Sequence, residues 1–240
     1  MLEWWRDFSA PEDVLLACGG SEADFRAVAH GQKFFADDPR LRTRDHQREF
    51  QSYTAVFREV SAWLRERPHD CVHFCEYDHL PLAVDLKRRQ AARLDAENAD
   101  VIGFRLLRVD GTSHPHYLYH AREPRFHEFW KTVSRRSDPL AVMSMFATGS
   151  VWRREAFDAV AEVAEPFPMY TELYLPTLAH HLGFRMRPLP DQDRFVDNLG
   201  DMGGKIAQAR QAGAWGIHPV KLLWQQTVDG ASQSPAARPG

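Results

Sequence analysis

Short apolar runs alternate with amphipathic stretches in the first half of this chain, and this alternation restricts its possible folds most. The apolar runs are typical of strands buried on both faces, and the stretches between them carry apolar residues at helical spacing. The predicted strands cover residues 14–18, 71–75 and 101–107, and the predicted helices 53–64 and 82–96. Strands separated by helices favour an α/β domain with a mainly parallel sheet flanked by helices.

The second half predicts a more mixed architecture. The sequence Val109-Asp110-Gly111-Thr112 is typical of a hairpin turn, which predicts a small antiparallel element. Pro176 suits a first helical turn, so a helix is expected to begin near residue 175. The expected segments are hairpin arms at 105–109 and 113–120, a strand at 141–147, a helix at 153–163 and a mobile glycine-rich loop at 191–216. We expect a single domain over residues 1–228 and a disordered tail over 229–240.

Charge and composition exclude several classes of protein. The 240 residues carry a formal net charge of -3, which gives no global attraction to nucleic acid. No apolar run is long enough to cross a bilayer, and the amino terminus lacks a signal sequence, so a cytoplasmic protein without a transmembrane segment is expected. The three cysteines are best interpreted as buried free thiols.

Two carboxylates follow the predicted strand at residues 71–75. Glu76 and Asp78 are two residues apart, and such residues point the same way on an extended chain. At the carboxyl end of a strand, their oxygens suit a divalent cation and the hydroxyls of a ribose. A loop that begins with two solvated acids is the simpler interpretation, and spacing alone leaves both open.

Three further motifs carry groups that suit the same chemistry. His218 offers an imidazole to a metal and Lys221 an ammonium to phosphate, although both also suit a solvated segment. Glu172 precedes an apolar helical stripe, where it suits either the helix dipole or a general base. The small turn at Gly149 and Ser150 would let a ligand approach the backbone, or would simply connect two elements.

The order of these motifs resembles the GT-A type of nucleotide-sugar glycosyltransferase, and family 2 in particular. The resemblance spans roughly residues 13–221 and includes a first strand that ends at Gly19. It implies a GT-A-like, Rossmann-like fold in which the acidic motif binds a metal and the donor. Asp78 would then be the main metal ligand, Glu76 a ribose or outer contact, and His218 the second metal ligand.

The resemblance also implies a mechanism. Mn²⁺ or Mg²⁺ would stabilise the leaving diphosphate with help from Lys221, and Gly149 and Ser150 would lie near the sugar. Glu172 would take the proton of a hydroxyl acceptor, carbohydrate or other. This sequence has Glu76 where the family usually has aspartate. Contacts to the nucleotide base are left open among three residues, Glu22, Asp45 and Gln51.

Two other functions stay open. His114, His116 and His120 share one parity on the second arm of the expected hairpin, which suits a metal-dependent oxygenase of the cupin type. The same fold could also serve a non-catalytic protein that binds sugar nucleotides or carbohydrate. The sequence does not specify the sugar, the nucleotide, the acceptor, inversion or retention, or the oligomeric state.

Overall fold

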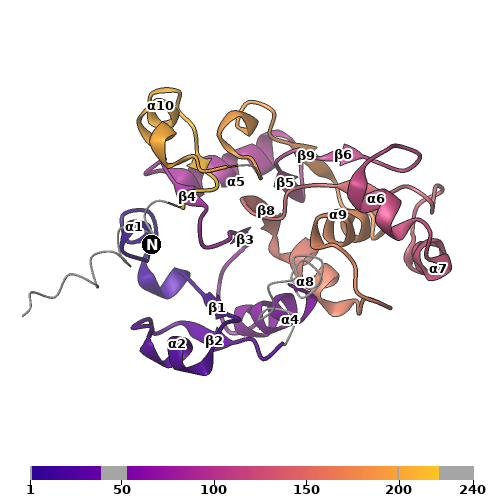
Figure 1. Ribbon diagram of the computed structural model, residues 1–240, viewed down its shortest axis with the longest axis horizontal. Helices are drawn as coiled ribbons and strands as arrows, with labels where there is room; N and C mark the ends of the chain where they lie inside the picture. Colours follow the sequence, from indigo (N-terminus) through magenta and orange to yellow (C-terminus); the bar gives the residue numbers. More distant parts are fainter. Residues whose placement is uncertain (1, 39–52, 199, 222–240) are drawn as a thin grey trace, which may run out of the picture.

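A computed structural model describes residues 2–38, 53–198 and 200–221 (Figure 1). Its helices are α1 (Leu2–Trp5), α2 (Glu22–Ala27), α4 (Tyr53–Leu64), α5 (Leu86–Ala96), α6 (Pro115–His120), α7 (Pro124–Val133), α8 (Arg154–Glu162), α9 (Thr171–His181) and α10 (Ile206–Gln211). Its strands are β1 (Leu16–Cys18), β2 (Lys33–Phe35), β3 (Cys71–Phe74), β4 (Leu80–Pro81), β5 (Val101–Gly103), β6 (Leu107–Arg108), β7 (Met143–Ser144), β8 (Ser150–Arg153), β9 (Met186–Pro188) and β10 (Gly216–Ile217). The mixed α/β class expected from the sequence is therefore confirmed.

The central sheet is small and mixed, in the order β3-β8-β5-β9. Strand β8 is antiparallel to both β3 and β5, whereas β5 and β9 are parallel. Strands β1 and β2 are also parallel and form a separate sheet, and Val196 and His218 form an isolated parallel bridge. The expected mainly parallel sheet is thus not found, because β8 starts beside the end of β3, where Gly149 N donates to Phe74 O (2.7 Å), and then runs back along it.

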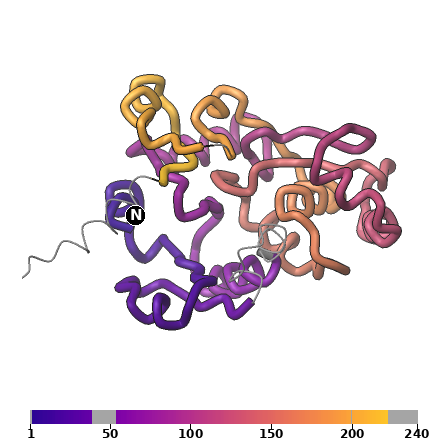
Figure 2. The backbone as a smooth tube through the Cα atoms, viewed as in Figure 1, coloured from indigo at the N-terminus to yellow at the C-terminus, as the bar shows by residue number. Residues whose placement is uncertain are grey.

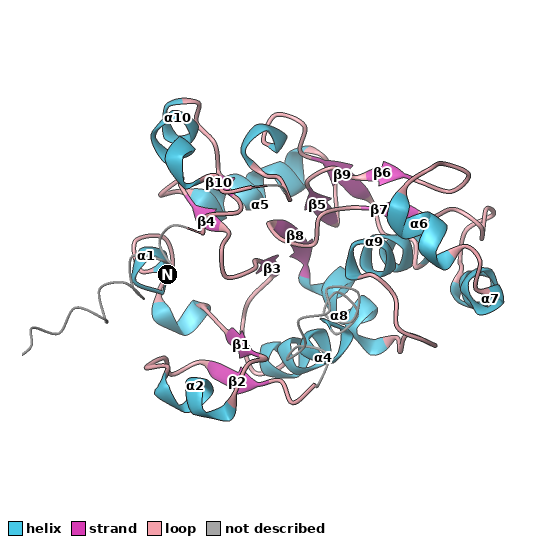
Figure 3. Ribbon diagram, in the orientation of Figure 1, coloured by secondary structure: helices cyan, strands magenta, loops and turns pink. Residues whose placement is uncertain are grey.

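Helices cover the central sheet on both sides. Neighbouring residues of a strand point to opposite faces, and the two cores follow this rule. Val101 and Trp152 belong to the core shared with α4, α8 and α9, whereas Ile102 and Val151 belong to the core that contains Leu94 of α5. Figure 3 shows these helices on the two sides of the sheet. Strand β5 is therefore buried on both faces, as its apolar run predicts, whereas β3 is only half-buried.

The predicted hairpin is wrong in its second arm. Residues 115–120 form helix α6, and β6 pairs antiparallel with β7 instead. Pro115 occupies the first position of α6, where its fixed φ suits a helix and its missing N–H costs nothing. A small antiparallel element exists, but its second strand, β7, lies well beyond residue 120, where the expected arm ends.

Helix α9 begins four residues earlier than predicted, at Thr171, and Pro176 lies inside it. A proline at this position cannot donate the helical hydrogen bond to the carbonyl of residue 172. In this fold that carbonyl accepts from Met145 N at 3.0 Å. The strand segment beside the helix thus satisfies the group that Pro176 leaves without a partner, and Glu172 becomes part of the helix.

The carboxyl-terminal part is more regular than the predicted loop. Residues 191–216 include the 3₁₀ turns Asp193–Phe195 and Gly203–Lys205 and helix α10. Ala209 of α10 packs in a core with Leu80 of β4 and Ile217 of β10. Helix α1 lies beside β4, since Trp4 Nε1 donates to Pro81 O at 2.8 Å, and Figure 2 shows the two ends of the described chain close together.

The structure bears in part on two further expectations, the carboxyl-terminal tail and the absence of a transmembrane segment. The boundary at residue 228 and the tail over 229–240 lie outside the described residues. No helix among the described residues has the length and apolar character that crossing a membrane would need.

We predict that Leu178→Ala lowers the free energy of unfolding by about 2–5 kcal/mol, because Leu178 is fully buried between α9 and its neighbours. Chemical denaturation measures this change. Leu118→Ala is the control, since Leu118 is 46% exposed on α6 and its loss should cost less than about 0.5 kcal/mol. Equal losses in the two variants would contradict the assigned core.

Candidate functional site

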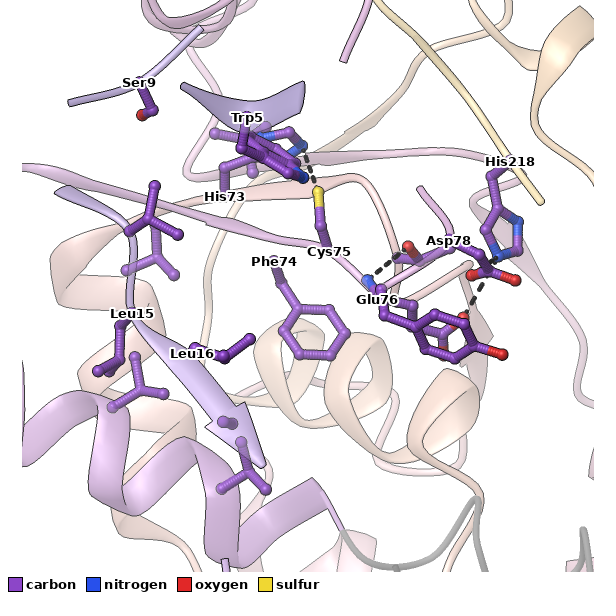
Figure 4. A pocket seen from close by; sticks show the side chains of 18 of the residues that line it. Trp5, Ser9, Leu15, Leu16, His73, Phe74, Cys75, Glu76, Asp78 and His218 are labelled. Atoms are coloured by element: carbon purple, nitrogen blue, oxygen red, sulfur yellow. Dashed lines mark hydrogen bonds and ion pairs between the residues drawn. The ribbon is translucent and has the colours of Figure 1, made fainter. Parts of the chain in front are cut away.

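A cavity of about 1160 Å³ separates the amino-terminal β1 segment from the end of β3. Apolar side chains such as Leu16 and Phe74 form one part of its wall (Figure 4). The other part is polar and comes from distant segments of the chain. Its ionisable members include Glu76, Asp78, Glu172, His218 and Lys221. The structure thus brings most of the predicted site residues to one cavity.

The acidic motif meets His218 at the end of β3. The Nε2 atom of His218 lies 3.3 Å from a carboxylate oxygen of Glu76 and 3.2 Å from one of Asp78. Asp78 and His218 are only 6% and 7% exposed. The three side chains form a cluster whose ligand atoms all lie within 4.8 Å of one another, which we call the acidic cluster.

Thr148 holds the Glu76 end of this cluster. Its Oγ1 atom accepts a hydrogen bond from Glu76 N at 3.0 Å and lies 3.2 Å from His79 Nδ1. The adjacent Gly149 has φ of 76°, and a Cβ there would lie 2.4 Å from the Phe104 ring and 2.5 Å from His79. Only glycine therefore fits this turn, which fixes the place where β8 meets the acidic motif.

The carboxyl-terminal strand β10 orients His218. The Nδ1 atom of His218 donates to the carbonyl of Asp197 at 2.7 Å, and the backbone N–H of His218 donates to Phe195 O. This leaves Nε2 to face the two carboxylates. Burial opposes a charge on the ring, but the hydrogen bonds to Asp78 and Glu76 outweigh it and raise the pKa of His218 to about 9.

The donor set of the acidic cluster suits a hard divalent cation. Two carboxylates and an imidazole are ligands that Mn²⁺ accepts, and Mg²⁺ accepts the carboxylates. The proton on His218 Nε2 lies between the same two carboxylates and would leave when a cation binds, since a metal needs the neutral imidazole. The residues present therefore fit the predicted metal, with Glu76 beside the predicted ligands Asp78 and His218.

Glu172 lies at the second position of α9, and its side chain is 24% exposed. One of its oxygens is 3.4 Å from His116 Nδ1, and the His116 ring stacks on Tyr170 with centroids 4.3 Å apart. Burial and the charge of Glu76 raise the pKa of Glu172 to about 7. Such a carboxyl can hold or release a proton near neutral pH, which a solvated helix-end acid cannot.

The remaining predicted contacts divide into two groups. Gly19 and the exposed Lys221 line the cavity, and Lys221 N donates to Asp201 at 2.9 Å. Gly149 and Ser150 are buried and do not line it, and Ser150 Oγ donates to Ala147 O while it accepts from Trp152 Nε1. Ser150 thus holds β8 together in this structure, and Gly149 acts through its close packing.

The candidates for contact to a nucleotide base are not brought together. Glu22 is exposed on α2, pairs with Arg26 and does not line the cavity. Asp45 and Gln51 lie outside the described residues.

The three histidines of the oxygenase alternative have separate partners. His120 Nε2 accepts from Tyr170 N at 3.0 Å, His114 Nε2 lies 3.4 Å from Ser144 Oγ, and His116 faces Glu172. They do not form a convergent metal-binding group among the described residues. The equal parity on which that alternative depends is lost because residues 115–120 are helical.

The sequence alone did not reveal four contributors to the site. His79 and Thr148 lay inside motifs already singled out, but their mutual contact joins segments 69 residues apart. His116 was assigned to a metal rather than to Glu172. The carbonyl of Asp197, which orients His218, left no signal, because every residue carries a carbonyl.

Comparison with known proteins does not add a family assignment. No protein-family model matches this sequence, and no curated protein matches it. The geometry of the cavity and the chemistry of its side chains are therefore what indicate a function.

We predict that Gly149→Ala destabilises the protein by more than Gly111→Ala. Both glycines have φ near 70°, so each alanine costs about 1–2 kcal/mol in backbone strain. A Cβ at Gly111 meets nothing within 4 Å, whereas at Gly149 it meets Phe104 and His79, and such overpacking adds about 1–3 kcal/mol. Chemical denaturation of both variants measures the difference, and equal losses would contradict the packing of this turn.

We also predict that the metal-free protein loses stability as the pH rises from 6.5 to 9. The folded state raises the pKa of His218 from 6.5 to about 9, so its charged form stabilises the fold fully below pH 6.5 and no longer does above about 9. The loss amounts to roughly 3 kcal/mol at most. Thermal melting across this range tests it.

The control for this pH dependence is His218→Gln, which removes the titrating group and should flatten the slope. Saturating Mn²⁺ should also flatten or reverse it, because the cation replaces the proton. A slope that is unchanged in His218→Gln would show that another group causes it.

Proposed function

We propose that this protein is a metal-dependent glycosyltransferase that moves a sugar from a nucleoside-diphosphate sugar to a hydroxyl acceptor. The observation that carries the proposal is the acidic cluster on the wall of a large cavity that also contains the perturbed carboxyl Glu172. A cation-binding group and a candidate base in one cavity are what such a transfer requires. The resemblance of the motif order to the GT-A type supports the same reaction and a GT-A-like domain.

The acidic cluster would hold the cation, with Asp78 and His218 as ligands and Glu76 beside them. When bound, Mn²⁺ or Mg²⁺ would supply positive charge for the diphosphate that leaves. Lys221 lies on the same cavity wall with an exposed side chain, so its ammonium suits the phosphates of a bound donor. Gly19 borders the cavity from β1, where a backbone without a side chain leaves room for the nucleoside.

Glu172 would act on the acceptor. A carboxylate oxygen of Glu172 takes the proton of the acceptor hydroxyl. At the same time the hydroxyl oxygen of the acceptor forms a bond to the anomeric carbon, and the bond from this carbon to the diphosphate oxygen breaks. This direct displacement inverts the anomeric centre. His116, stacked on Tyr170, holds Glu172 from one side, so the free oxygen of the carboxylate is available to the cavity.

The size of the cavity agrees with two substrates. Sites for single small molecules commonly measure about 300–1,000 Å³. The cavity here has about 1160 Å³, and it combines an apolar wall near β1 with the polar wall near β3. It therefore suits a donor that places its nucleoside near β1 and its diphosphate at the acidic cluster.

We predict that Asp78→Asn abolishes the Mn²⁺-dependent binding of a nucleoside diphosphate. The amide keeps the shape of the side chain but loses the charge that attracts a hard cation. Calorimetry with UDP or GDP, with and without Mn²⁺, measures the binding. Asp95→Asn is the control, because Asp95 is 72% exposed and does not line the cavity. Undiminished metal-dependent binding in Asp78→Asn would exclude this metal site.

We predict that Glu172→Gln lowers turnover by roughly 10²–10⁴-fold and leaves donor affinity nearly unchanged. Glu155→Gln is the matched control, since Glu155 is the second residue of α8 as Glu172 is of α9, but is solvent exposed. Hydrolysis of the sugar donor measures turnover until an acceptor is known. A wild-type rate in Glu172→Gln would show that Glu172 is not the base and serves only at the end of helix α9.

The same variant has a second readout. Wild-type turnover should fall as the pH drops through the pKa of Glu172, which is about 7 in the metal-free protein because of burial and the charge of Glu76. A cation that offsets the charge of Glu76 should lower this pKa. This acid limb should be absent in Glu172→Gln. Donor binding without any turnover, in wild type as well, would favour the non-catalytic binding protein instead.

A further inference from the structure

Three side chains outside the proposed mechanism also converge at the end of β3. They are His73, Cys75 and His79, and one potential ligand atom of each lies within 4.8 Å of the other two. Cys75 Sγ is 3.2 Å from His73 Nε2. We call these residues the thiol cluster.

The thiol cluster and the acidic cluster occupy different sides of one strand end. Along an extended chain, His73 and Cys75 point one way and Phe74 and Glu76 the other. Figure 4 shows His73 and Cys75 beside Trp5 of α1, while Glu76 and Asp78 lie with His218. The two sets share no residue, so a ligand of one does not use the ligands of the other.

We propose that the thiol cluster is a second cation site, for Zn²⁺ or a similar thiophilic divalent cation. A thiolate and two imidazoles are ligands that zinc prefers, whereas Mg²⁺ and Mn²⁺ prefer the oxygens of the acidic cluster. Bonds of about 2.0–2.3 Å at tetrahedral angles place ligand atoms roughly 3.3–3.7 Å apart. The observed Sγ to Nε2 distance of 3.2 Å already approaches this spacing.

The surroundings suit a cation with an open position. His73 and Cys75 line the cavity, so three protein ligands would leave a fourth coordination position facing it. Thr148 Oγ1, 3.2 Å from His79 Nδ1, restrains the ring of His79, as partners of metal-binding histidines commonly do. Coordination would replace the thiol proton of Cys75, which passes to the solvent.

A cation at this place would also connect the two clusters mechanically. His79 follows Asp78 directly, and its ring stacks on His218 with centroids 5.8 Å apart. Fixing His79 to His73 and Cys75 would therefore restrain the loop that carries Asp78. The site itself does not depend on the proposed glycosyl transfer.

Cobalt substitution of the full chain tests the proposal. Adding one equivalent of Co²⁺ should produce the thiolate-to-cobalt charge-transfer absorption in the near ultraviolet, and Zn²⁺ should remove it. Cys75→Ser should abolish the band, whereas Cys71→Ser, which changes a cysteine outside the cluster on the same strand, should keep it. Asp78→Asn should keep it too, which separates this site from the acidic cluster.

Alkylation of the wild-type chain provides a test that needs no variant to fold. Zn²⁺ should slow the modification of Cys75 by iodoacetamide at least tenfold, as peptide mass spectrometry reports, and leave Cys71 and Cys18 unaffected. Absence of the cobalt band, its persistence in Cys75→Ser, its loss in Cys71→Ser, or equal alkylation of Cys75 with and without Zn²⁺ would each overturn the proposal.

Discussion

The close approach of two carboxylates, Asp78 buried and Glu76 half-buried, is the constraint on which the site depends. Glu76 and Asp78 repel one another in a poorly solvated place, so the fold has to supply positive charge there. In the metal-free protein the imidazolium of His218 does so. Backbone contacts hold the segment that carries it in place: β10 pairs with β4, and the backbone carbonyl of Asp78 accepts from Val220 N at 2.9 Å. A divalent cation would supply the same compensation with more charge, so the arrangement that stabilises the apo fold also suits metal binding.

The sequence predicted the members of the site better than the fold around them. Glu76, Asp78 and His218 were named together on the resemblance to the GT-A type, and they converge although His218 lies 140 residues beyond Asp78. Strand β8 was not predicted, because Ser150 and Arg153 interrupt the apolar pattern and the segment was assigned to a turn and to the start of a helix. Its antiparallel direction, which makes the central sheet mixed, was therefore not predictable either. The start of α9 was missed because a long-range bond from Met145 satisfies the carbonyl that Pro176 leaves free.

The histidines before α9 illustrate how local conformation decides a side chain's role. In an extended arm His114, His116 and His120 would face one side, but in a helix each residue turns by about 100° from the last. The helix places His120 against Tyr170 N and His116 against Glu172. Residues that would form a metal site in a strand instead shape the surroundings of a carboxyl whose pKa is about 7.

The acidic cluster also cannot be completed during synthesis until the segment that carries His218 has been made. During synthesis, Glu76 and Asp78 emerge long before the imidazole that pairs with them. Until residue 218 has been added, the two carboxylates have no cationic partner from β10 and favour solvent over the interior. Closure of this side of the cavity is therefore expected to wait until residue 218 has left the ribosome, and a cation in the surrounding medium could compensate the two carboxylates during that interval.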